Sequence, residues 1–367
     1  MYDFAIVGAG VNGCAIAHEL VKEGSSVLLL DKEAIASGGS GAAGAFVAPK
    51  FAKSGELKEL MHNSFIYSMA FYEKNFPSAF SKVELLHMAT DEKTSQMLRA
   101  YKESTTLPQL PMNDDVKRLA GDDEAIFIEA GVVDAAKMCH LLCEGAEFAK
   151  VDVERLERVG QKWVVNETIE AKNVILATGA YKKVIDESYL KIRGIWGHRI
   201  EVKTSTQNRY SLHKYLSISP SKDGIIAIGA THNLSYHPQT SSEPYDLQQG
   251  RVELLDKAKK MLDFEELEVV KDFVGLRSGS VDYMPLIGSV VDAKKSYAQG
   301  KNFRKKGVSY KEFIYYENLY MINGSSGYGF VFAPYLAKML KAHILEGAAL
   351  EKSVDVARYF AREARRS

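Results

Sequence analysis

A short glycine-rich sequence near the start of the chain has the spacing of a nucleotide-binding turn. Gly8, Gly10 and Gly13 follow one apolar run, residues 4–7, and open a segment whose apolar residues recur at helical spacing. Gly8 permits a tight turn, Gly10 lets the backbone approach a pyrophosphate, and Gly13 allows close contact between helix and strand. Asp31, eighteen positions after Gly13, can accept hydrogen bonds from a ribose. The sequence therefore predicts a dinucleotide site in a strand–turn–helix–strand unit.

Further glycine-containing segments favour FAD over NAD as that dinucleotide. Residues 37–44 form a glycine-dense turn, residues 177–180 end a buried strand, and residues 324–329 precede a helix. A flavin binds at two places, adenine beside the sheet and isoalloxazine at a domain junction, and glycines permit close backbone approach at both. The helix that begins near Gly329 can direct its positive N-terminus at the flavin pyrimidine and stabilise the reduced form. An ordinary turn at 324–329 and an NAD-dependent dehydrogenase remain open alternatives.

The order of the predicted elements indicates two domains. The expected elements are strands at 4–7, 26–30, 146–153 and 173–178, helices at 11–20, 56–76 and 134–145, and alternating β-rich sequence at 197–229. We therefore expect an α/β fold with an α+β second domain. Its parts are a Rossmann-type FAD-binding domain made of 1–82, 134–200 and 315–367, and an antiparallel-sheet substrate domain made of 83–133 and 201–314.

The charge balance and the cysteine pattern argue against some classes of function. Lys plus Arg number 47 and Asp plus Glu number 47, so there is no global field for a polyanion, and nucleic acid binding requires a local patch. The longest polar segment, 292–311, is basic, and we expect a solvated loop there. Cys14, Cys139 and Cys143 form no disulfide or zinc pattern, so we expect buried thiols and no metal site.

The chain has no apolar run of about 18 residues, so we expect no membrane span. It enters an apolar strand after Met1-Tyr2-Asp3, without the features of a secretory signal, and we expect a cytoplasmic location. The sequence does not indicate an oligomeric state.

Four segments together resemble a known family. Residues 8–13 with Asp31 look like its cofactor fingerprint, Ser40–Gly44 like its second flavin-contacting loop, Val174–Ala180 like its ATG strand, and Gly275–Gly288 like its GLRP…D..P.IG segment. The family is the D-amino acid oxidase-like (DAO) superfamily of FAD-dependent oxidoreductases, which includes glycine oxidase, sarcosine oxidase and D-amino acid dehydrogenase. Within it, residues 40–49, the helix 60–76 and the insertion 291–314 resemble the FAD-dependent oxidase half of the bifunctional tRNA-modifying MnmC enzymes.

The resemblance implies non-covalent FAD, because no histidine or cysteine of the covalent-flavin type falls at 40–46. The cofactor contacts it implies are Gly8, Gly10, Val11, Asn12, Gly13, Asp31, Lys32, Ser40, Ala43, Gly44, Val153, Ala177, Thr178, Gly179, Gly327, Tyr328 and Gly329.

The resemblance also implies an active site. Arg277 matches the arginine that pairs with the substrate carboxylate, and a guanidinium can hold a carboxylate with two parallel hydrogen bonds. Gly327 stands where glycine oxidase has a second arginine, so we expect Tyr328 or Tyr283 to contribute a phenol hydrogen bond instead. His198 and His232 are interpreted as structural.

The implied reaction is oxidation of the C–N bond of a small amino acid or N-substituted glycine by hydride transfer to flavin. The substrate is then a small carboxylate-bearing amine, or the carboxymethylaminomethyl group of a modified uridine in tRNA. The alternatives are an oxidase or dehydrogenase of free glycine, sarcosine or a D-amino acid, and a redox-inactive FAD-binding subunit.

Overall fold

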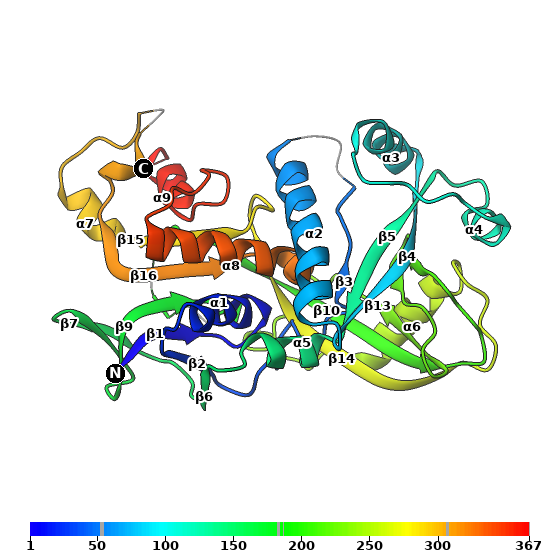
Figure 1. Cartoon of the computed structure of the whole chain (residues 1–367), viewed down its shortest axis with the longest axis horizontal. Helices are drawn as coiled ribbons and strands as arrows, with labels where there is room; N and C mark the ends of the chain where they lie inside the picture. Colours follow the sequence, from blue (N-terminus) through cyan, green and yellow to red (C-terminus); the bar gives the residue numbers. More distant parts are fainter. Residues whose placement is uncertain (52–54, 182–183, 186, 306–307, 367) are drawn as a thin grey trace. The chain divides into compact units, whose positions relative to one another are not determined.

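The chain divides into two compact units in a computed structural model that describes residues 1–51, 55–181, 184–185, 187–305 and 308–366 (Figure 1). The first unit comprises Met1–Ser37, Cys139–Gly194 and Arg277–Ser367, and the second comprises Gly38–Met138 and Ile195–Leu276. Each unit is built around its own sheet, so the two are described separately.

A largely parallel sheet organises the first unit. Its strand order is β15-β16-β9-β1-β2-β6, and a hairpin of β7 and β8 extends from β9. The strands are β1 (Tyr2–Val7), β2 (Val27–Asp31), β6 (Glu147–Lys150), β7 (Leu156–Val159), β8 (Lys162–Val165), β9 (Ile169–Leu176), β15 (Leu286–Val291) and β16 (Tyr315–Asn323).

The central strand β1 pairs in parallel with both β2 and β9. Its residues Phe4 to Val7 are buried, as expected for a parallel strand that is covered on both faces. The predicted Rossmann-type unit is confirmed.

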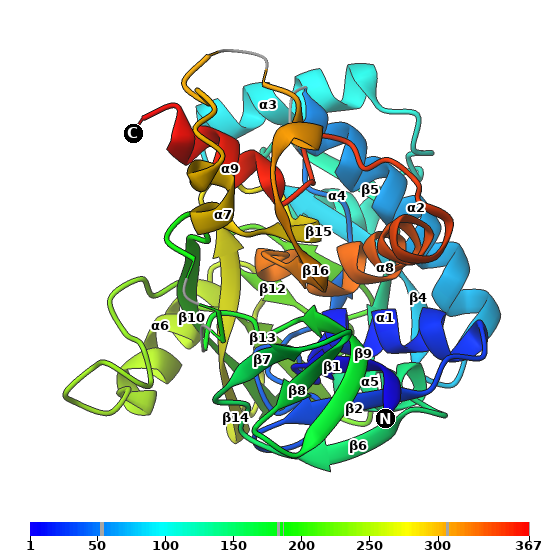
Figure 2. The same cartoon turned by 90° about the vertical axis from the view of Figure 1, so that its left-hand side faces the viewer.

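Helices of the first unit flank this sheet. They are α1 (Val11–Lys22), α7 (Ala293–Ala298), α8 (Gly329–Glu346) and α9 (Ala357–Ala364), with 3-10 turns η1 (Tyr310–Glu312) and η2 (Ser326–Tyr328); α5 (Ala135–Leu142) begins in the second unit and ends in the first. Helices α1 and α8 pack against each other, as Figures 1 and 2 show. Gly347 ends α8 in the left-handed conformation, φ 69°, that a glycine adopts without a steric penalty.

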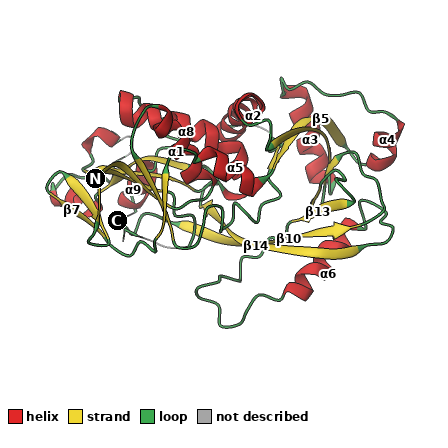
Figure 3. Ribbon diagram, turned by 60° about the horizontal axis from the view of Figure 1, so that its bottom comes forward, coloured by secondary structure: helices red, strands yellow, loops and turns green. Residues whose placement is uncertain are grey.

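The second unit contains a mostly antiparallel sheet in the order β14-β10-β13-β12-β11-β4-β5-β3. The strands are β3 (Phe46–Val47), β4 (Phe80–Met88), β5 (Ala125–Val133), β10 (Ile192–Lys203), β11 (Ser211–His213), β12 (Ser217–Ile218), β13 (Ile225–Gly229) and β14 (Glu268–Ser280). Long strands β10 and β14 lie next to each other (Figure 3). The expected antiparallel sheet is confirmed, with one parallel pairing between β4 and β11.

Helices α2 (Glu56–Asn75), α3 (Glu92–Ser104), α4 (Asp114–Ala120) and α6 (Leu247–Ala258) belong to the second unit. Apolar side chains of α4 and α6 form a core with one face of the sheet, where Val116 and Leu254 join Ile200, Ile226 and Ile228. Since side chains alternate along a strand, residues such as Arg199 and Gly229 belong to the opposite face.

The boundaries of the two units differ from those of the two domains expected from the sequence. Residues 38–82 fall in the second unit, where β4 pairs with β5, and residues 277–314 fall in the first, where β15 pairs with β16. The expectation of a loop throughout 292–311 is wrong at 293–298, because Asp292 accepts a hydrogen bond from the backbone N of Lys295 and caps helix α7. None of the helices within the described ranges is long and apolar enough to cross a membrane.

Candidate functional site

The turn between β1 and α1 can be built only from glycine at its two ends. A Cβ at Gly8 would lie 2.3 Å from the carbonyl oxygen of Ala177, and a Cβ at Gly13 would lie 1.9 Å from the carbonyl oxygen of Gly8. Gly8 also has φ +109°, which other residues rarely adopt. The turn therefore lies directly against the end of β9, as the glycine spacing predicts.

Side chains and backbone groups brace the middle of this turn. The Ala9 backbone N donates to Asp31 Oδ2 at 2.9 Å, and the Ala9 carbonyl accepts from the Ala36 backbone N at 2.9 Å and from Cys14 Sγ at 3.4 Å. The other oxygen of Asp31 accepts from the Glu33 backbone N at 3.0 Å. Asp31 therefore holds the turn in place, and its contact with a ribose stays a prediction. Lys32 lies beside it, with Nζ 5.4 Å from the ring centroid of Tyr181.

The start of α1 and the segment before α8 meet in the first unit. Ser325 Oγ donates to Asn12 Oδ1 at 3.1 Å, and a Cβ at Gly329 would lie 3.0 Å from Val11 Cγ1. Gly10, the residue before α1, has no side chain with which to cap that helix. Two helix N-termini thus lie together, and their dipoles favour negative charge beside them.

The strand end 177–179 belongs to the same cluster. Asn323 Nδ2 donates to the Gly179 carbonyl at 2.9 Å, which ties the end of β9 to the end of β16. The predicted glycine turn, the strand end with Ala177, Thr178 and Gly179, and the 324–329 segment are therefore brought together. Close backbone approach without side chains, next to helix N-termini, fits a dinucleotide such as FAD.

Arg277 lies beside the 324–329 segment. It is partly buried near the end of β14, and its Cδ lies 3.9 Å from where a Cβ on Gly327 would be. Two residues further, Gly279 forms a bridge with Ser325. Burial lowers the pKa of the Arg277 guanidinium from its usual value, although a guanidinium still keeps its charge at neutral pH. A cation thus stands next to Gly327.

The two candidate tyrosines differ in their surroundings. The ring of Tyr328 packs edge-on against Phe332 at 6.3 Å between centroids, and burial raises the pKa of its phenol. Tyr328 therefore stays protonated at neutral pH and keeps an O–H to donate. Tyr283 is 66% exposed and has φ +65°. Its neighbour Asp282 accepts hydrogen bonds from Arg358 and Arg362, which lower the pKa of this carboxyl to about 2 against the effect of its burial and fix the turn after Arg277.

The remaining loop contacts, Ser40, Ala43 and Gly44, belong to the second unit. There the Ala42 carbonyl accepts from Arg199 Nε at 3.3 Å, and a Cβ at Gly275 would lie 2.9 Å from the Ala42 Cβ. The loop is thus packed against β10 and β14 of its own unit. Its contacts with FAD stay predictions, as does that of Val153, whose side chain is 3% exposed in the core of the first unit.

Sequence reasoning missed a row of polar residues across the second sheet. The register pairs Arg199 with Gly229, Gly229 with Ser217, Ser217 with His213, and His213 with His87. Directly paired residues point to the same face, so this row lies on the face opposite the core with α4 and α6. Each residue comes from a different strand, and no local motif signals the row.

Burial keeps both imidazoles of this row neutral. It lowers the pKa of His87 to about 4 and that of His213 to about 3. His87 stacks on Phe51 at 4.3 Å and His213 meets Phe46 edge-on at 4.9 Å. Within the described ranges, His87 Nδ1 and His213 Nε2 have no hydrogen-bond partner.

His198 occupies a structural position instead. Its buried ring bonds Asp272 Oδ1 through Nε2 at 2.9 Å, and Arg251 also binds that carboxylate. His232 is exposed. The thiols of Cys14, Cys139 and Cys143 are buried as expected, and no metal-binding group of His, Cys, Asp or Glu side chains occurs in the part of the chain that the structure describes.

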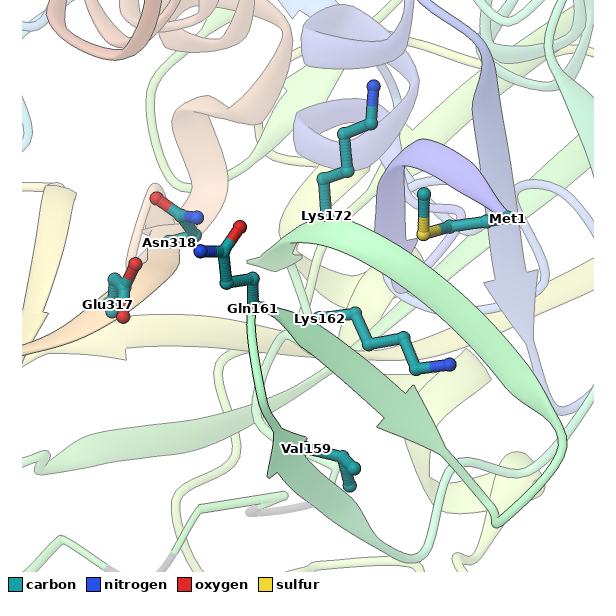
Figure 4. A pocket seen from close by; sticks show the side chains of 7 residues that line it. All are labelled: Met1, Val159, Gln161, Lys162, Lys172, Glu317 and Asn318. Carbon is teal, nitrogen blue, oxygen red and sulfur yellow. The ribbon is translucent and has the colours of Figure 1, made fainter.

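A surface hollow of about 430 Å³ lies elsewhere on the first unit (Figure 4). It is lined by Met1, Val159, Gln161, Lys162, Lys172, Glu317 and Asn318. No residue predicted for the site lines it, and its lysines already pair with carboxylates, Lys162 with Glu170 and Lys172 with Asp3.

Comparison with known proteins identifies relatives in sequence. The tRNA 5-methylaminomethyl-2-thiouridine biosynthesis bifunctional protein MnmC of Legionella pneumophila (strain Corby) is 26% identical over 360 residues, covering 91% of this chain and 53% of that protein. The MnmC protein of Campylobacter concisus (strain 13826) is 24% identical over 340 residues, covering 88% and 53%. The chain spans about half the length of these curated relatives.

Solved structures share the fold. Glycine oxidase from Geobacillus kaustophilus superimposes with a TM-score of 0.78 at 21% identity, covering 98% of this chain and 97% of that chain. L-proline dehydrogenase from P. horikoshii gives 0.74 at 17% identity, with 99% and 98% covered. These likenesses confirm the expected fold class.

A family model described as FAD dependent oxidoreductase (DAO) matches residues 3–342, so the match includes the glycine turn, the strand end at 177–179 and Arg277. The resemblance inferred from the motifs is confirmed. The chain belongs to the DAO family of FAD-dependent oxidoreductases, with FAD as its cofactor.

Proposed function

We propose that this chain oxidises the C–N bond of a small carboxylate-bearing amine, with non-covalently bound FAD as the hydride acceptor. The observation that carries the proposal is Arg277, a partly buried cation beside the 324–329 segment at the start of α8. A cation in that position can hold a substrate carboxylate through two parallel hydrogen bonds and so orient the neighbouring carbon. A cytoplasmic location is part of the proposal.

The chain's own residues have limited tasks in this reaction. Arg277 binds the carboxylate, and Tyr328 donates a hydrogen bond from its protonated phenol. The glycine turn, Asp31 and the N-termini of α1 and α8 hold the cofactor. Bound FAD supplies the two-electron oxidation, and the imine product hydrolyses in water.

The proposed substrate is the carboxymethylaminomethyl group on the wobble uridine of tRNA. Two observations support it: the sequence similarity to proteins named for tRNA 5-methylaminomethyl-2-thiouridine biosynthesis, which extends over 91% of this chain, and the glycine at 327 in place of a second arginine. Arg277 can hold the carboxylate end of the substrate, and Gly327 leaves the rest of the substrate unconstrained. A base attached to a large RNA requires such room.

Anaerobic reduction of the flavin tests the reaction. The visible band of the oxidised flavin is expected to bleach on mixing with tRNA that carries the carboxymethylaminomethyl group. Bleaching by glycine, sarcosine or a D-amino acid, but not by that tRNA, would favour a free amino acid as substrate. No bleaching by any of these compounds would contradict the proposed reaction and favour a redox-inactive subunit.

Replacing Arg277 tests the residue. For Arg277→Leu we expect a loss of roughly 1.5–3 kcal/mol of carboxylate binding, since a charged hydrogen-bonded pair is removed. This corresponds to about ten- to hundredfold in substrate affinity. Arg277→Lys is the matched control, because it keeps the charge but loses the paired geometry, and we expect an intermediate effect. An unchanged Michaelis constant in both variants would place Arg277 outside the site.

A further inference from the structure

Basic residues gather on one part of the first unit. The chain carries no net charge, yet residues 292–311 contain seven lysines and arginines against one acid, Asp292. Arg365 and Arg366, which directly follow helix α9, add two more basic residues. We call the exposed members the basic face: Lys294, Lys295, Lys301, Arg304, Lys305, Lys311, Arg365 and Arg366.

Aromatic packing joins the two parts of the basic face. Phe360 of α9 lies 5.2 Å from Tyr297, 6.0 Å from Phe303 and 4.8 Å from Phe313, measured between ring centroids. Phe303 and Phe313 are 4% and 5% exposed. Figures 1 and 2 both show α7 and its following loop beside α9. The described part of the basic segment therefore packs against α9 through the buried rings of Phe303 and Phe313 and through Tyr297.

Several members of the basic face have no ion pair among the residues that the structure describes. Lys295 pairs with Asp292 at 3.0 Å. Across the residues that the structure places, no ion pair involves Lys301, Lys305, Arg365 or Arg366. Holding like charges close together in a folded protein is unfavourable unless a polyanion binds them.

The basic face is connected to the segment that carries Arg277. Asp282, five residues after Arg277, accepts from Arg358 Nη2 at 3.0 Å and from Arg362 Nη2 at 2.9 Å, and both arginines belong to α9. Helix α9 thus supports the turn that follows Arg277, and Arg365 and Arg366 of the basic face directly follow this helix.

We propose that the basic face binds the phosphate backbone of the RNA that carries the substrate base. This rests on the proposed function, and it assigns the contacts that hold the RNA apart from the modified base itself. Lysines and arginines that neutralise phosphates release counterions, which gives affinity without reading sequence. A lipid surface fits less well: among the large apolar residues exposed in the described ranges, only Tyr297 belongs to these segments, and peripheral membrane helices insert a broad apolar face.

Charge reversal tests the proposal on the FAD-bound protein. The test variant is K301E/K305E/R365E/R366E. The control variant, K93E/K222E/K259E/K260E, reverses the same number of exposed positive charges in the second unit. Binding of a fluorescent tRNA transcript is measured by anisotropy at several salt concentrations, and retained FAD absorbance reports folding. We expect the test variant to lose roughly ten- to hundredfold in affinity and to show a shallower salt dependence, while the control stays near the parent chain.

The outcomes separate this proposal from the proposed function. Equal tRNA binding by the test and control variants would overturn the basic face while leaving the tRNA substrate in place. A parent chain that binds no tRNA even at low salt but is reduced by free amines would overturn both the basic face and the tRNA substrate. Loss of binding to phosphatidylserine vesicles, with tRNA binding unchanged, would assign the face to a membrane. If no amine reduces the flavin but the test variant still loses tRNA binding, the proposed reaction is contradicted and the proposed RNA contact is retained.

Discussion

The two units form their polar features in different ways. In the first unit, backbone groups form the proposed cofactor site, since glycines at 8 and 13 remove side chains and the N-termini of α1 and α8 lie beside the turn. In the second unit, Arg199, His213 and His87 come from separate strands and are placed in one row by sheet register. A backbone site depends on short contiguous segments and tolerates no added atoms. A row of side chains depends on long-range strand pairing, and substitutions in it are expected to alter stability gradually.

Adding one methyl group to the glycine turn tests the first half of this comparison and has the largest expected effect. In Gly13→Ala, the new Cβ would lie 1.9 Å from the Gly8 carbonyl oxygen, so the turn or α1 must move. We expect a cost of about 3 kcal/mol or more and loss of bound FAD. FAD absorbance after gel filtration and urea unfolding measure both effects.

The matched control is Gly160→Ala in the hairpin of β7 and β8. Gly160 has φ +60° and no atom within 4 Å of the added Cβ, so only backbone strain of about 1 kcal/mol is expected. If Gly13→Ala retained FAD as well as Gly160→Ala does, the close approach of turn and helix would not be essential.

Acid pH tests the second half, through His87 and His213. Burial lowers the pKa of these imidazoles to about 4 and about 3 in the folded chain, while an unfolded histidine titrates near pH 6.5. The unfolded state therefore binds protons first as the pH falls. Stability is complete above about pH 6.5 and is lost progressively toward the folded pKa values.

The expected loss is on the order of 2 kcal/mol for each imidazole between pH 7 and pH 5. Urea unfolding at several pH values measures it. The variant His87→Gln/His213→Gln should flatten the pH dependence, whereas His140→Gln, at an exposed position, should leave it unchanged. The same slope in all three proteins would show that the row does not titrate as a buried pair.

Asp31→Asn sharpens the comparison, because it changes a side chain that supports a backbone site. The carboxylate accepts from the backbone N of Ala9 and of Glu33, and an amide can replace only one of these acceptors. We expect FAD binding to weaken by about 1.5 kcal/mol, which is roughly tenfold in affinity, measured by titration of the apoprotein with FAD. Asp256→Asn, at an exposed position on α6, should change neither value.

The smallest expected effect is at Tyr328. Tyr328→Phe removes the phenol hydrogen bond that we propose Tyr328 donates to substrate, which is about 1 kcal/mol or roughly fivefold in the Michaelis constant. Tyr283→Phe is the comparison, because its side chain is 66% exposed and we expect no change. A larger effect at Tyr283 than at Tyr328 would reverse the assignment of the donor.

Sequence patterns predicted the first unit well because its signals are local. The apolar run at 4–7, the glycine spacing and the helix after residue 10 all act within a few residues. The strands β4 and β5 were missed, although Ala125–Val133 is a long apolar run, because their pairing spans helices α3 and α4. The His87–His213 row depends on that same register, so no local pattern in the sequence could place it. Asp282 was part of the segment 275–288 that the sequence singled out, but its pairing with Arg358 and Arg362 is seen only in the structure, because those arginines lie 76 and 80 residues further along the chain.

The pairing of β1 with β9 also has a consequence for synthesis. Residues 4–7 are synthesised roughly 170 residues before residues 173–176, their partners on one side. At ribosomal rates of roughly 5–20 residues per second, this edge of β1 waits on the order of 10–30 seconds for its neighbour. During that interval Phe4, Ile6 and Val7 form an open, apolar strand edge, which is a site for chaperone binding or for aggregation when chaperones are scarce.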